Sequence, residues 1–424
     1  MLCAISAVSY MERVNVSAVG DFMMRDFQLD QPMMGQLFSA FLLGYALCQY
    51  PAGLLADRFG PRRVLGGAVL AWGICTVLTG MVENLVVVSW IGIFPTLLVI
   101  RFLLGVFESP TYPAAGRCIS RWVGPTGRAG ANAIVIAGIS VGSALTPPLL
   151  AHLATAWGWQ MALLCIAGPA FVLAIIWLLY ARDEPAQANL SEQARMTWRE
   201  TWASAPKLLT NKNLWVLTLS YALQNYISYI FVFWFFLYLV QVRHFDMLEG
   251  SWLATMPWLL ALVTTPLGGV ISDELVRRLG YPWGRRLWPL LAMQLAAVLL
   301  FLGARAEHPY FAVALLTLCQ GLVMSVEGAF WASMTEIAPE QAGAGGGILN
   351  MGGNLGGFLS PTVTPIVAAY FGWVAALAIG AGLSVLSALL WFLVTFPARA
   401  SMTPVSAVSA IDLTDHPFKD PKAL

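Results

Sequence analysis

Long apolar segments separated by short polar ones recur along the whole chain. Each is about 20 residues or longer, which is enough for an α-helix to cross the hydrocarbon core of a lipid bilayer. Only helices and closed barrels satisfy their backbone hydrogen bonds in that core, so we expect helices. Twelve are predicted, at residues 1–20, 33–56, 64–82, 96–120, 130–155, 159–181, 213–240, 250–273, 286–304, 309–335, 344–370 and 372–396.

Two of these segments carry additional features. Residues 1–20 are interpreted as a membrane helix with almost no polar segment before it, and not as a signal peptide, because Glu12 and Arg13 interrupt the apolar run. Residues 86–95 are expected to be extra apolar sequence before the fourth membrane helix, ended by Pro95. The prolines of Ser109-Pro110 and Tyr112-Pro113 are expected to disturb that fourth helix.

One long polar segment, residues 183–212, divides the chain into two parts of six predicted helices each. The sequence therefore predicts an all-α integral membrane protein with one six-helix bundle at 1–182 and another at 213–396. A local repeat suggests duplication, because Gly53-Leu-Leu-Ala-Asp57 and Gly269-Val-Ile-Ser-Asp273 occupy equivalent places in the two parts. Residues 397–424 are predicted to be a polar, disordered tail.

Composition supports lipid as the solvent of most of the chain and excludes several classes of protein. Of the 424 residues, 58% are hydrophobic and only 11% are charged, against about 25% charged in soluble proteins. The net charge of +1 excludes a nucleic-acid binder that depends on bulk charge. No P-loop is present, and the six Cys and four His lack the spacing of metal ligands or a catalytic triad. We therefore expect no cofactor, no metal and no enzymatic activity.

The basic residues predict the orientation in the membrane. Alternate loops contain Arg58, Arg62, Arg63, Arg117, Arg121, Arg128, Arg182, Arg195, Arg199, Lys207, Lys212, Arg277, Arg278, Arg285 and Arg286, whereas the opposite loops contain Arg25, Arg243 and Arg305. Cytoplasmic loops of membrane proteins are enriched in Lys and Arg. The linker 183–212 and both termini are therefore predicted to be cytoplasmic.

Four charged residues lie inside predicted helices of the first bundle: Glu12, Arg13, Arg101 and Glu108. A charge at the bilayer centre costs at least about 2.5–3.5 kcal/mol, so each needs a partner or a hydrated cavity. Glu12 and Arg13 are adjacent and must face different neighbours, whereas Arg101 and Glu108, seven residues apart, share one helix face. The alternative to a functional site is two structural ion pairs between the first and fourth helices.

The second bundle is polar but less charged. Its seventh helix carries Gln224, its tenth carries Glu327 and Trp331 on one face, and its eleventh carries Asn350 and Asn354 among glycines. The glycines permit close approach of helices. Substrate contact and helix packing are equally open for the aromatic residues, the asparagines and Glu327.

Several motifs resemble a known family. Gly53-Leu-Leu-Ala-Asp57-Arg58-Phe-Gly60-Pro-Arg62-Arg63 is similar to the loop between the second and third helices of the major facilitator superfamily. The motifs around Glu12-Arg13, Arg101-Phe-Leu-Leu-Gly-Val-Phe-Glu108, Phe330-Trp331 and Asn350-Met-Gly-Gly-Asn354 resemble the anion:cation symporter family, which includes bacterial hexonate, hexuronate and glucarate transporters.

The resemblance implies roles for individual residues. Glu12 and Glu108 are expected to couple protons, with Glu12 replacing the more usual Asp, and Arg13 is expected to bind the substrate anion. Tyr45, Arg101, Gln224, Trp331, Asn350 and Asn354 are further expected substrate-binding residues, with Glu327 as an open candidate. Gly53, Asp57, Arg58, Gly60, Arg62 and Asp273 are expected to form a cytoplasmic gate. Ile139 departs from sugar-acid transporters, which have a polar residue there, and this favours a less hydroxylated carboxylate.

Together these features predict a secondary transporter that carries a small organic anion, a sugar acid or another carboxylate, with protons by alternating access. It is expected to act as a monomer in a bacterial inner membrane, with lipid, protons and the anion as partners and no nucleic acid. The alternatives are an exporter, an anion carrier driven by membrane potential, a transporter-like nutrient sensor and, more remotely, a membrane enzyme with His152 as its base.

Overall fold

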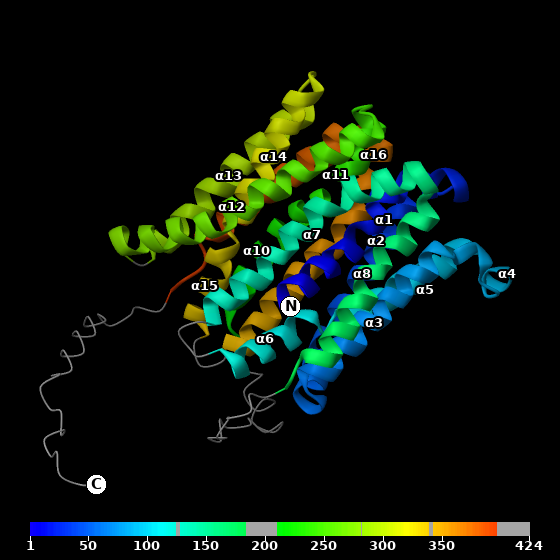
Figure 1. The fold of residues 1–424 in the computed structure, drawn as a ribbon. Coiled ribbons are helices and arrows are strands. Elements are labelled where there is room, and N and C mark those ends of the chain that lie inside the picture. The colour runs from blue at the N-terminus through cyan, green and yellow to red at the C-terminus, as the bar shows by residue number, and fades with distance from the viewer. Residues whose placement is uncertain (124–127, 184–209, 281, 339–341, 397–424) are drawn as a thin grey trace, which may run out of the picture.

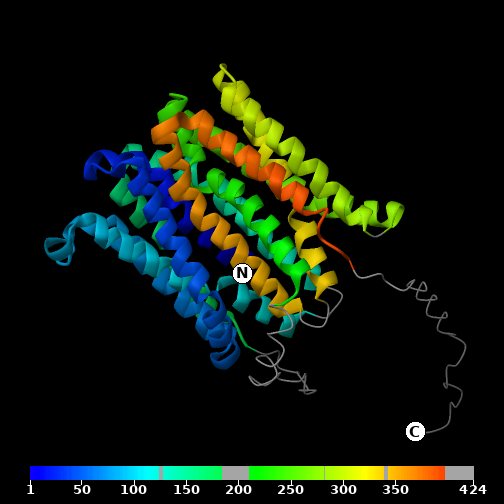
Figure 2. The same cartoon turned by 180° about the vertical axis from the view of Figure 1, so that it is seen from behind.

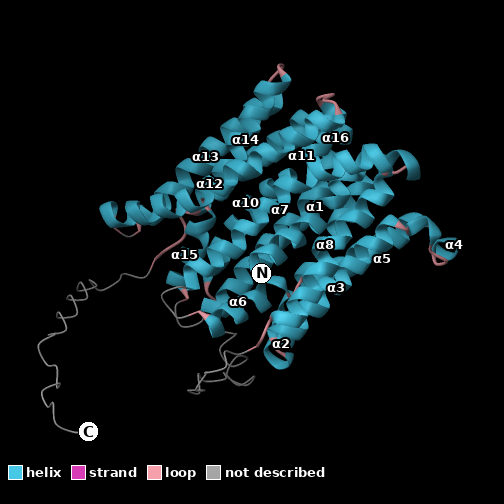
Figure 3. Cartoon of the chain, in the orientation of Figure 1, coloured by secondary structure: helices cyan, strands magenta, loops and turns pink. Residues whose placement is uncertain are grey.

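A computed structural model describes residues 1–123, 128–183, 210–280, 282–338 and 342–396. Within these ranges the regular structure is helical and contains no strand (Figure 3). The predicted tail and nearly all of the predicted linker fall outside the described residues.

The first half of the chain contains six long helical stretches with short helices between some of them. Their bounds are α1 (Leu2–Phe27), α2 (Gln31–Phe59), α3 (Pro61–Gly80), the 3-10 turn η1 (Val82–Asn84), α4 (Val88–Ile91), α5 (Ile93–Glu108), α6 (Thr111–Trp122), α7 (Arg128–Trp157) and α8 (Trp159–Tyr180). Among these, α5 and α6 correspond to one predicted membrane helix, which is interrupted at Ser109-Pro110 as the sequence predicts.

The second half repeats this plan. Its elements are α10 (Lys212–Phe233), α11 (Phe235–Leu237), the π-turn η2 (Tyr238–Val242), α12 (Met247–Leu279), α13 (Trp283–Arg305), α14 (Pro309–Ser325), α15 (Glu327–Ile337) and α16 (Ala342–Leu390). The last of these is two helices joined at Gly372, whose φ of 82° is a left-handed conformation that breaks the helix.

Nine of the described helical stretches are long and apolar enough to cross a membrane. One of them, within α16, contains the break at Gly372 and so holds two predicted spans. The long helices α1 and α2 supply the remaining two. The prediction of an all-helical membrane protein with two six-helix bundles is confirmed.

Three local details differ from the sequence-based expectation. Pro95 does not end the apolar segment before the fourth membrane helix; Gly92, with a φ of 86°, separates α4 from α5, and Pro95 lies in the first turn of α5. A proline is tolerated there because the first amides of a helix have no intrahelical acceptor. The predicted helices 213–240 and 309–335 are also interrupted, at Trp234 and Val326 respectively.

The two halves lie side by side (Figures 1 and 2). Helices α3, α5 and α8 form one edge of the bundle and α12, α13 and α14 form the opposite edge, while α1, α7, α10 and α16 lie between them. We call the end of the bundle that holds Met1 and Gly60 the terminal face, and the end that holds Gly158 and Gly372 the distal face.

Small residues set the closest helix approaches around α1. Gly138 and Gly142 are four residues apart on α7, a spacing typical of close helix packing. A Cβ at Gly138 would lie 2.4 Å from the carbonyl oxygen of Cys3, and a Cβ at Gly142 would lie 2.1 Å from that of Ala7. Only glycine permits this separation between α7 and α1. The close packing holds α1, which carries Glu12 and Arg13, in the centre of the molecule.

Hydrogen bonds join the two halves on the distal side of Arg13. Ser17 Oγ donates to the carbonyl oxygen of Phe233 at 2.5 Å, and Gln241 Nε2 donates to Asp21 Oδ1 at 2.9 Å. Ser39 Oγ donates to the carbonyl oxygen of Phe358 at 2.7 Å. The interface between the halves therefore includes α1, α2 and α16 and carries polar contacts at the depth of the buried charges and beyond.

Candidate functional site

Helices α1 and α5 bring Arg13 and Glu108 into direct contact at the centre of the molecule. Arg13 Nη2 donates to Glu108 Oε1 at 2.6 Å, and Arg13 Nε donates to the same oxygen at 3.2 Å. Both side chains are almost completely buried. A buried ion pair needs further hydrogen bonds to offset the loss of hydration of its charges.

Glu108 uses its two carboxylate oxygens unequally. Oε1 accepts the Arg13 hydrogen bonds and a third one, at 2.6 Å, from Ser9 Oγ. Oε2 is buried and has no hydrogen-bond partner among the described residues. The unpartnered oxygen is notable because a buried ionised carboxylate is normally hydrogen-bonded on both oxygens. It is therefore a position where a proton can be held.

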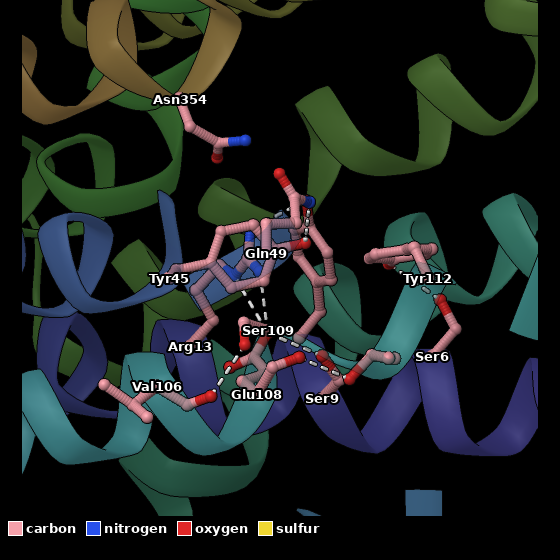
Figure 4. Close-up of polar contacts among 12 residues, drawn as sticks. Ser6, Ser9, Arg13, Tyr45, Gln49, Val106, Glu108, Ser109, Tyr112 and Asn354 are labelled. Atoms are coloured by element: carbon pink, nitrogen blue, oxygen red, sulfur yellow. Dashed lines mark hydrogen bonds and ion pairs between the residues drawn. The ribbon is translucent and has the colours of Figure 1, made fainter. Parts of the chain in front are cut away.

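Aromatic rings surround the Arg13 guanidinium. Its Cζ lies 4.4 Å from the ring centroid of Tyr10, 4.7 Å from that of Tyr45 and 5.0 Å from that of Phe41. These cation–π contacts stabilise a guanidinium that water reaches poorly. Figure 4 shows Tyr45 directly beside Arg13. The expected substrate-binding residue Tyr45 is thus in the same cluster as Arg13.

Arg13 also contacts the other half of the protein. Its Nη1 donates to the hydroxyl of Tyr229 on α10 at 3.3 Å, and that hydroxyl donates to Asn354 Oδ1 on α16 at 3.2 Å. Asn354 Nδ2 in turn donates to the carbonyl oxygen of Asn350 at 2.8 Å. Figure 4 shows the Asn354 amide facing Arg13 and Tyr45 across the interface. One hydrogen-bonded chain therefore connects the buried charges to α10 and α16.

Glu12 and Arg101 lie beside this ion pair but do not form a second one among the described residues. Glu12 Oε2 accepts hydrogen bonds from Asn15 Nδ2, at 3.0 Å, and from Thr76 Oγ1, while its Oε1 is buried and has no partner in the described part of the chain. Arg101 donates to Asn15 Oδ1 at 3.3 Å and to the carbonyl oxygen of Arg13 at 3.4 Å. Of the two structural ion pairs considered as an alternative, the pair between Arg13 and Glu108 is present. The second pair is absent among the described residues, because Asn15 lies between Glu12 and Arg101 and bonds to both.

These contacts place Arg101 differently from Arg13. Its side chain is buried, its Nε has no hydrogen-bond partner among the described residues, and its contacts are with α1 and the ring of Phe41, 5.2 Å away. Arg101 thus holds the backbone and side chains of α1 in position. Arg13 is instead the residue that reaches both halves.

In the second half, neutral polar side chains line the face of α10 toward α14. Gln224 is buried and donates to the carbonyl oxygen of Val323 at 3.0 Å, while its own oxygen accepts from Asn225 at 2.9 Å. Both contacts lie within this half. Gln224 is therefore fully engaged in joining α10 to α14 in this conformation.

Glu327 forms a separate polar cluster with two aromatic side chains. Its Oε1 accepts a hydrogen bond from the hydroxyl of Tyr221, at 2.5 Å, and another from Nε1 of Trp331, at 3.0 Å. The break at Val326 makes Glu327 the first residue of α15, yet Glu327 and Trp331 still share the face toward α10. The sequence pattern placed these residues together correctly.

The expected gate residues lie on the terminal face. Arg62 donates from its backbone amide to Asp183 Oδ1 at 2.8 Å and from Nε to the carbonyl oxygen of Leu178 at 3.1 Å. Arg58 is exposed against Phe59, Gly60 has a φ of 83°, and a Cβ at Gly53 would lie 3.6 Å from Pro113. Asp273 pairs with Arg285 at 2.7 Å. The side chain of Asp57 lies outside the described part of the structure.

Several residues of the central cluster were not predicted from the sequence. Ser9 and Thr76 bind the two acids directly, and the hydroxyls of Ser6 and Tyr112 lie 3.1 Å apart beside them. Ser6, Ser9 and Arg13 are spaced at i, i+3 and i+7, so the helical period would have placed the two serines on the face of Arg13. Thr76 on α3 has no comparable signal, because a single Thr in an apolar helix is common.

Metal binding has no support in the described part of the chain, where no three His, Cys, Asp or Glu side chains come together in a way that could hold an ion. The six cysteines are free, and Cys75 and Cys319 are buried. The buried polar chemistry of the described residues is therefore that of carboxylates, guanidinium groups, amides and hydroxyls.

Comparison with known proteins identifies the family. The sequence profile of the Major Facilitator Superfamily matches residues 2–282 and 252–420. A probable galactarate/D-glucarate transporter, GudP, from Escherichia coli strain K12 is 28% identical over 383 residues, which cover 85% of this chain and 84% of that protein. A probable sulfoacetate transporter, SauU, from Cupriavidus necator is 27% identical over 374 residues, covering 86% and 85%.

Solved structures show the same fold. A bacterial homologue of the human lysosomal transporter Spinster, in an inward-facing and occupied conformation, has a TM-score of 0.77 at 19% identity and covers 93% of this chain and 95% of its own. A D-xylose–proton symporter has a TM-score of 0.74 at 16% identity, with 93% and 96% covered. The predicted resemblance to organic-anion transporters is confirmed, and the chain belongs to the Major Facilitator Superfamily as an integral membrane transporter and not an enzyme.

Proposed function

We propose that the protein is a proton-coupled symporter of a small organic anion, working by alternating access. The observation that carries the proposal is the position of Arg13. This one guanidinium binds a buried carboxylate of the first half, Glu108, and a hydroxyl of the second half, Tyr229. Because Arg13 contacts both halves at their interface, a substrate that binds to Arg13 alters contacts in both halves.

Proton binding and anion binding are linked through this guanidinium. A proton on Oε2 of Glu108 neutralises the carboxylate and weakens its attraction for Arg13. Arg13 is then available for a substrate carboxylate, which it can bind bidentately. Linkage is reciprocal, so a bound anion must also favour protonation of the site. Anion and proton consequently cross the membrane together.

The net charge of the buried groups also favours transport of the anion together with a proton. The ionised forms of Glu12, Arg13, Arg101 and Glu108 sum to zero, and a bound monoanion makes the group net negative. An uncompensated charge is costly in a buried site, so protonation of one acid accompanies anion binding. Glu12 and Glu108 each have one buried, unpartnered oxygen that can hold the proton.

The substrate class proposed from the relatives is a sugar acid or another small carboxylate. The similar proteins are named as transporters of galactarate and D-glucarate, of sulfoacetate and of hexuronate. Ile139 on α7 favours a substrate with fewer hydroxyls, because an apolar side chain cannot replace the hydrogen bonds that a sugar hydroxyl loses. We also propose that the protein is monomeric and lies in a bacterial inner membrane.

Transport by purified protein in sealed vesicles tests the proposal. An inward proton gradient without a membrane potential is expected to drive accumulation of a labelled carboxylate, and a proton ionophore is expected to abolish it. Accumulation that follows only an imposed membrane potential would instead support a potential-driven carrier. Movement of the anion against the direction of proton entry would support an exporter.

Orientation is tested separately. The distribution of basic residues favours a cytoplasmic position for the terminal face, both termini and the segment 183–212. A reporter fused after Leu190 is expected to be active only as a cytoplasmic reporter. A periplasmic result would invert the assigned orientation, although the pairing of Arg13 with Glu108 would be unaffected.

A further inference from the structure

Glu327 is an acid within a predicted membrane helix that the proposed coupling of Arg13 and Glu108 does not use. It belongs to the second half, where the other polar groups that face α10, α14 and α16 are neutral amides and hydroxyls. An acid in this environment costs free energy unless a function requires it. Its surroundings therefore indicate what it is placed to bind.

Only one of the two carboxylate oxygens of Glu327 accepts hydrogen bonds from the described residues. Tyr221 and Trp331 both donate to Oε1, whereas Oε2 makes no hydrogen bond with the described residues. In Glu12 and Glu108 the oxygen that lacks a hydrogen-bond partner among the described residues is fully buried. In Glu327 the corresponding oxygen, Oε2, is not fully buried, and the side chain as a whole is only partly buried. Two donors thus orient the carboxylate, and its second oxygen stays available to a ligand.

The position of Glu327 relative to Arg13 follows from α10. Glu327 is bonded to Tyr221 and Arg13 is bonded to Tyr229, eight residues further along the same helix. Eight residues correspond to about 12 Å along a helix axis. Glu327 and Arg13 thus both bond to buried tyrosines of the same helix.

These two groups have opposite charge and different roles. Arg13 offers a cation to a substrate carboxylate, and Glu327, bonded to a tyrosine about 12 Å along α10 from the one that Arg13 contacts, offers an acceptor oxygen. For a separation of the order of that rise, a hydrogen bond of about 3 Å at each end leaves about 6 Å between the polar ends of a molecule that contacts both groups. A second carboxylate at that distance would meet Glu327 and be repelled.

We propose that Glu327, Tyr221 and Trp331 form a subsite for a cationic group, and that the preferred substrate is a zwitterion with a carboxylate at Arg13 and an ammonium group at Glu327. This inference rests on the proposed function and names its substrate class more closely. The two aromatic rings meet edge to face, with centroids 6.5 Å apart. Aromatic faces beside a carboxylate are a favourable environment for an ammonium group.

Charge counting supports a zwitterion over a dianion. With Glu327 ionised, its charge and the four buried charges of the first half already sum to one negative charge. A zwitterion leaves that sum unchanged, and one proton then neutralises the site. A dianion would raise the sum to three negative charges, and each excess buried charge is costly. The predicted preference therefore differs from that expected for a dicarboxylate such as glucarate.

Matched ligands test the subsite directly. Binding to the purified full-length protein is measured by calorimetry for 5-aminopentanoate, pentanedioate and pentanoate, which share one chain length and differ only in the end group. Homologues from three to six carbons are tested in the same three forms, so that the end groups are compared at the chain length that binds best. For the best length, we expect the amino acid to bind at least about tenfold more tightly than the dianion.

Two variants test whether Glu327 causes the preference for the amino acid over the dianion. Glu327→Gln retains the hydrogen bonds to Tyr221 and Trp331 but loses the charge, and it is expected to abolish the preference while leaving pentanoate binding within about twofold. Glu249→Gln is the control, because Glu249 also accepts a tyrosine hydrogen bond, from Tyr310, but is exposed near the distal face. It is expected to keep the preference.

The outcomes separate this inference from the proposed function. Tighter binding of the dianions, or an equal loss of all three ligands in Glu327→Gln, would overturn the cationic subsite while Arg13-dependent carboxylate binding stands. A preference that survives Glu327→Gln would place the cation elsewhere and also overturn it. Binding of none of these carboxylates at any length would contradict the proposed function itself.

Discussion

The two halves share one helical plan but bury different chemistry. The first half buries Glu12, Arg13, Arg101 and Glu108 at its centre, each almost inaccessible to solvent. The second half presents neutral groups such as Tyr229 and Asn354 to the same interface, with Glu327 as its single charged contribution among the described residues that face the interface.

This difference indicates a division of labour. Buried charges respond strongly when a proton or an anion arrives, because the low-polarity surroundings screen them little. Neutral hydroxyls and amides change little in energy with protonation but discriminate between ligands by hydrogen bonding. We therefore expect the first half to control energy coupling and the second half to adjust affinity and selectivity. The following variants test that expectation, beginning with the largest effect.

Glu108→Gln is expected to abolish proton-driven accumulation. Gln keeps the shape and a hydrogen-bonding oxygen for Arg13 but cannot gain or lose a proton, so the variant resembles the protonated state. It should still bind substrate and exchange labelled for unlabelled substrate across vesicles. Uptake with and without a proton gradient, together with exchange, measures this separation.

Two results would contradict that assignment. Full accumulation by Glu108→Gln would move coupling to Glu12 or Glu327, and in the second case the contrast between the halves would fail. Loss of exchange together with accumulation would show that Glu108 is required for the conformational cycle itself.

Arg13→Lys is expected to weaken anion binding by roughly tenfold to a hundredfold. Lysine keeps the charge but cannot reproduce the planar, bidentate donor pair, and a hydrogen bond to a charged group is worth about 1.5–3 kcal/mol. Calorimetry measures the change. Arg25→Lys is the control, since Arg25 lies on the same helix and is exposed, although its partner Asp21 is buried. Unchanged affinity in Arg13→Lys would reduce Arg13 to a structural partner of Glu108.

Tyr229→Phe is expected to weaken substrate binding by about threefold to tenfold while proton coupling persists. The change removes the hydroxyl that joins Arg13 to Asn354, and one neutral hydrogen bond contributes about 0.5–1.5 kcal/mol. Tyr226→Phe is a matched control on α10, because the Tyr226 hydroxyl contacts Thr364 and not Arg13. Loss of coupling in Tyr229→Phe would show that the second half takes part in energy transfer.

Asp57→Asn is expected to slow transport several-fold and to leave substrate affinity within a few-fold. Asp57 belongs to the motif that begins at Gly53 and lies near the end of α2 on the terminal face, where a charge can interact with a neighbouring helix end. Initial uptake rates and calorimetry distinguish the two quantities. Asp246→Asn on the distal side, where Asn can still cap α12, is the control. Loss of affinity in folded Asp57→Asn would make Asp57 a binding residue.

The sequence alone was sufficient for the membrane helices and for the unusual residues within them. Hydrophobic length decides whether a segment crosses a bilayer, and this is a local property of about 20 residues. The same reasoning identified Glu12, Arg13, Arg101 and Glu108, because charges are expensive in an apolar run. It also required Glu12 and Arg13 to face different neighbours, and the structure places them toward α3 and α5 respectively.

Only the tertiary structure decided which of the buried charged side chains pair with one another. The sequence allowed two ion pairs between the first and fourth membrane helices, but packing paired Arg13 with Glu108 and left Asn15 between Glu12 and Arg101. The contacts of Thr76, Ser9 and Tyr229 with these charges were likewise unpredictable in detail. Lipid is as apolar as the helix surfaces, so hydrophobicity does not select which faces meet; close packing of small residues and buried hydrogen bonds do, and these depend on helices far apart in the chain.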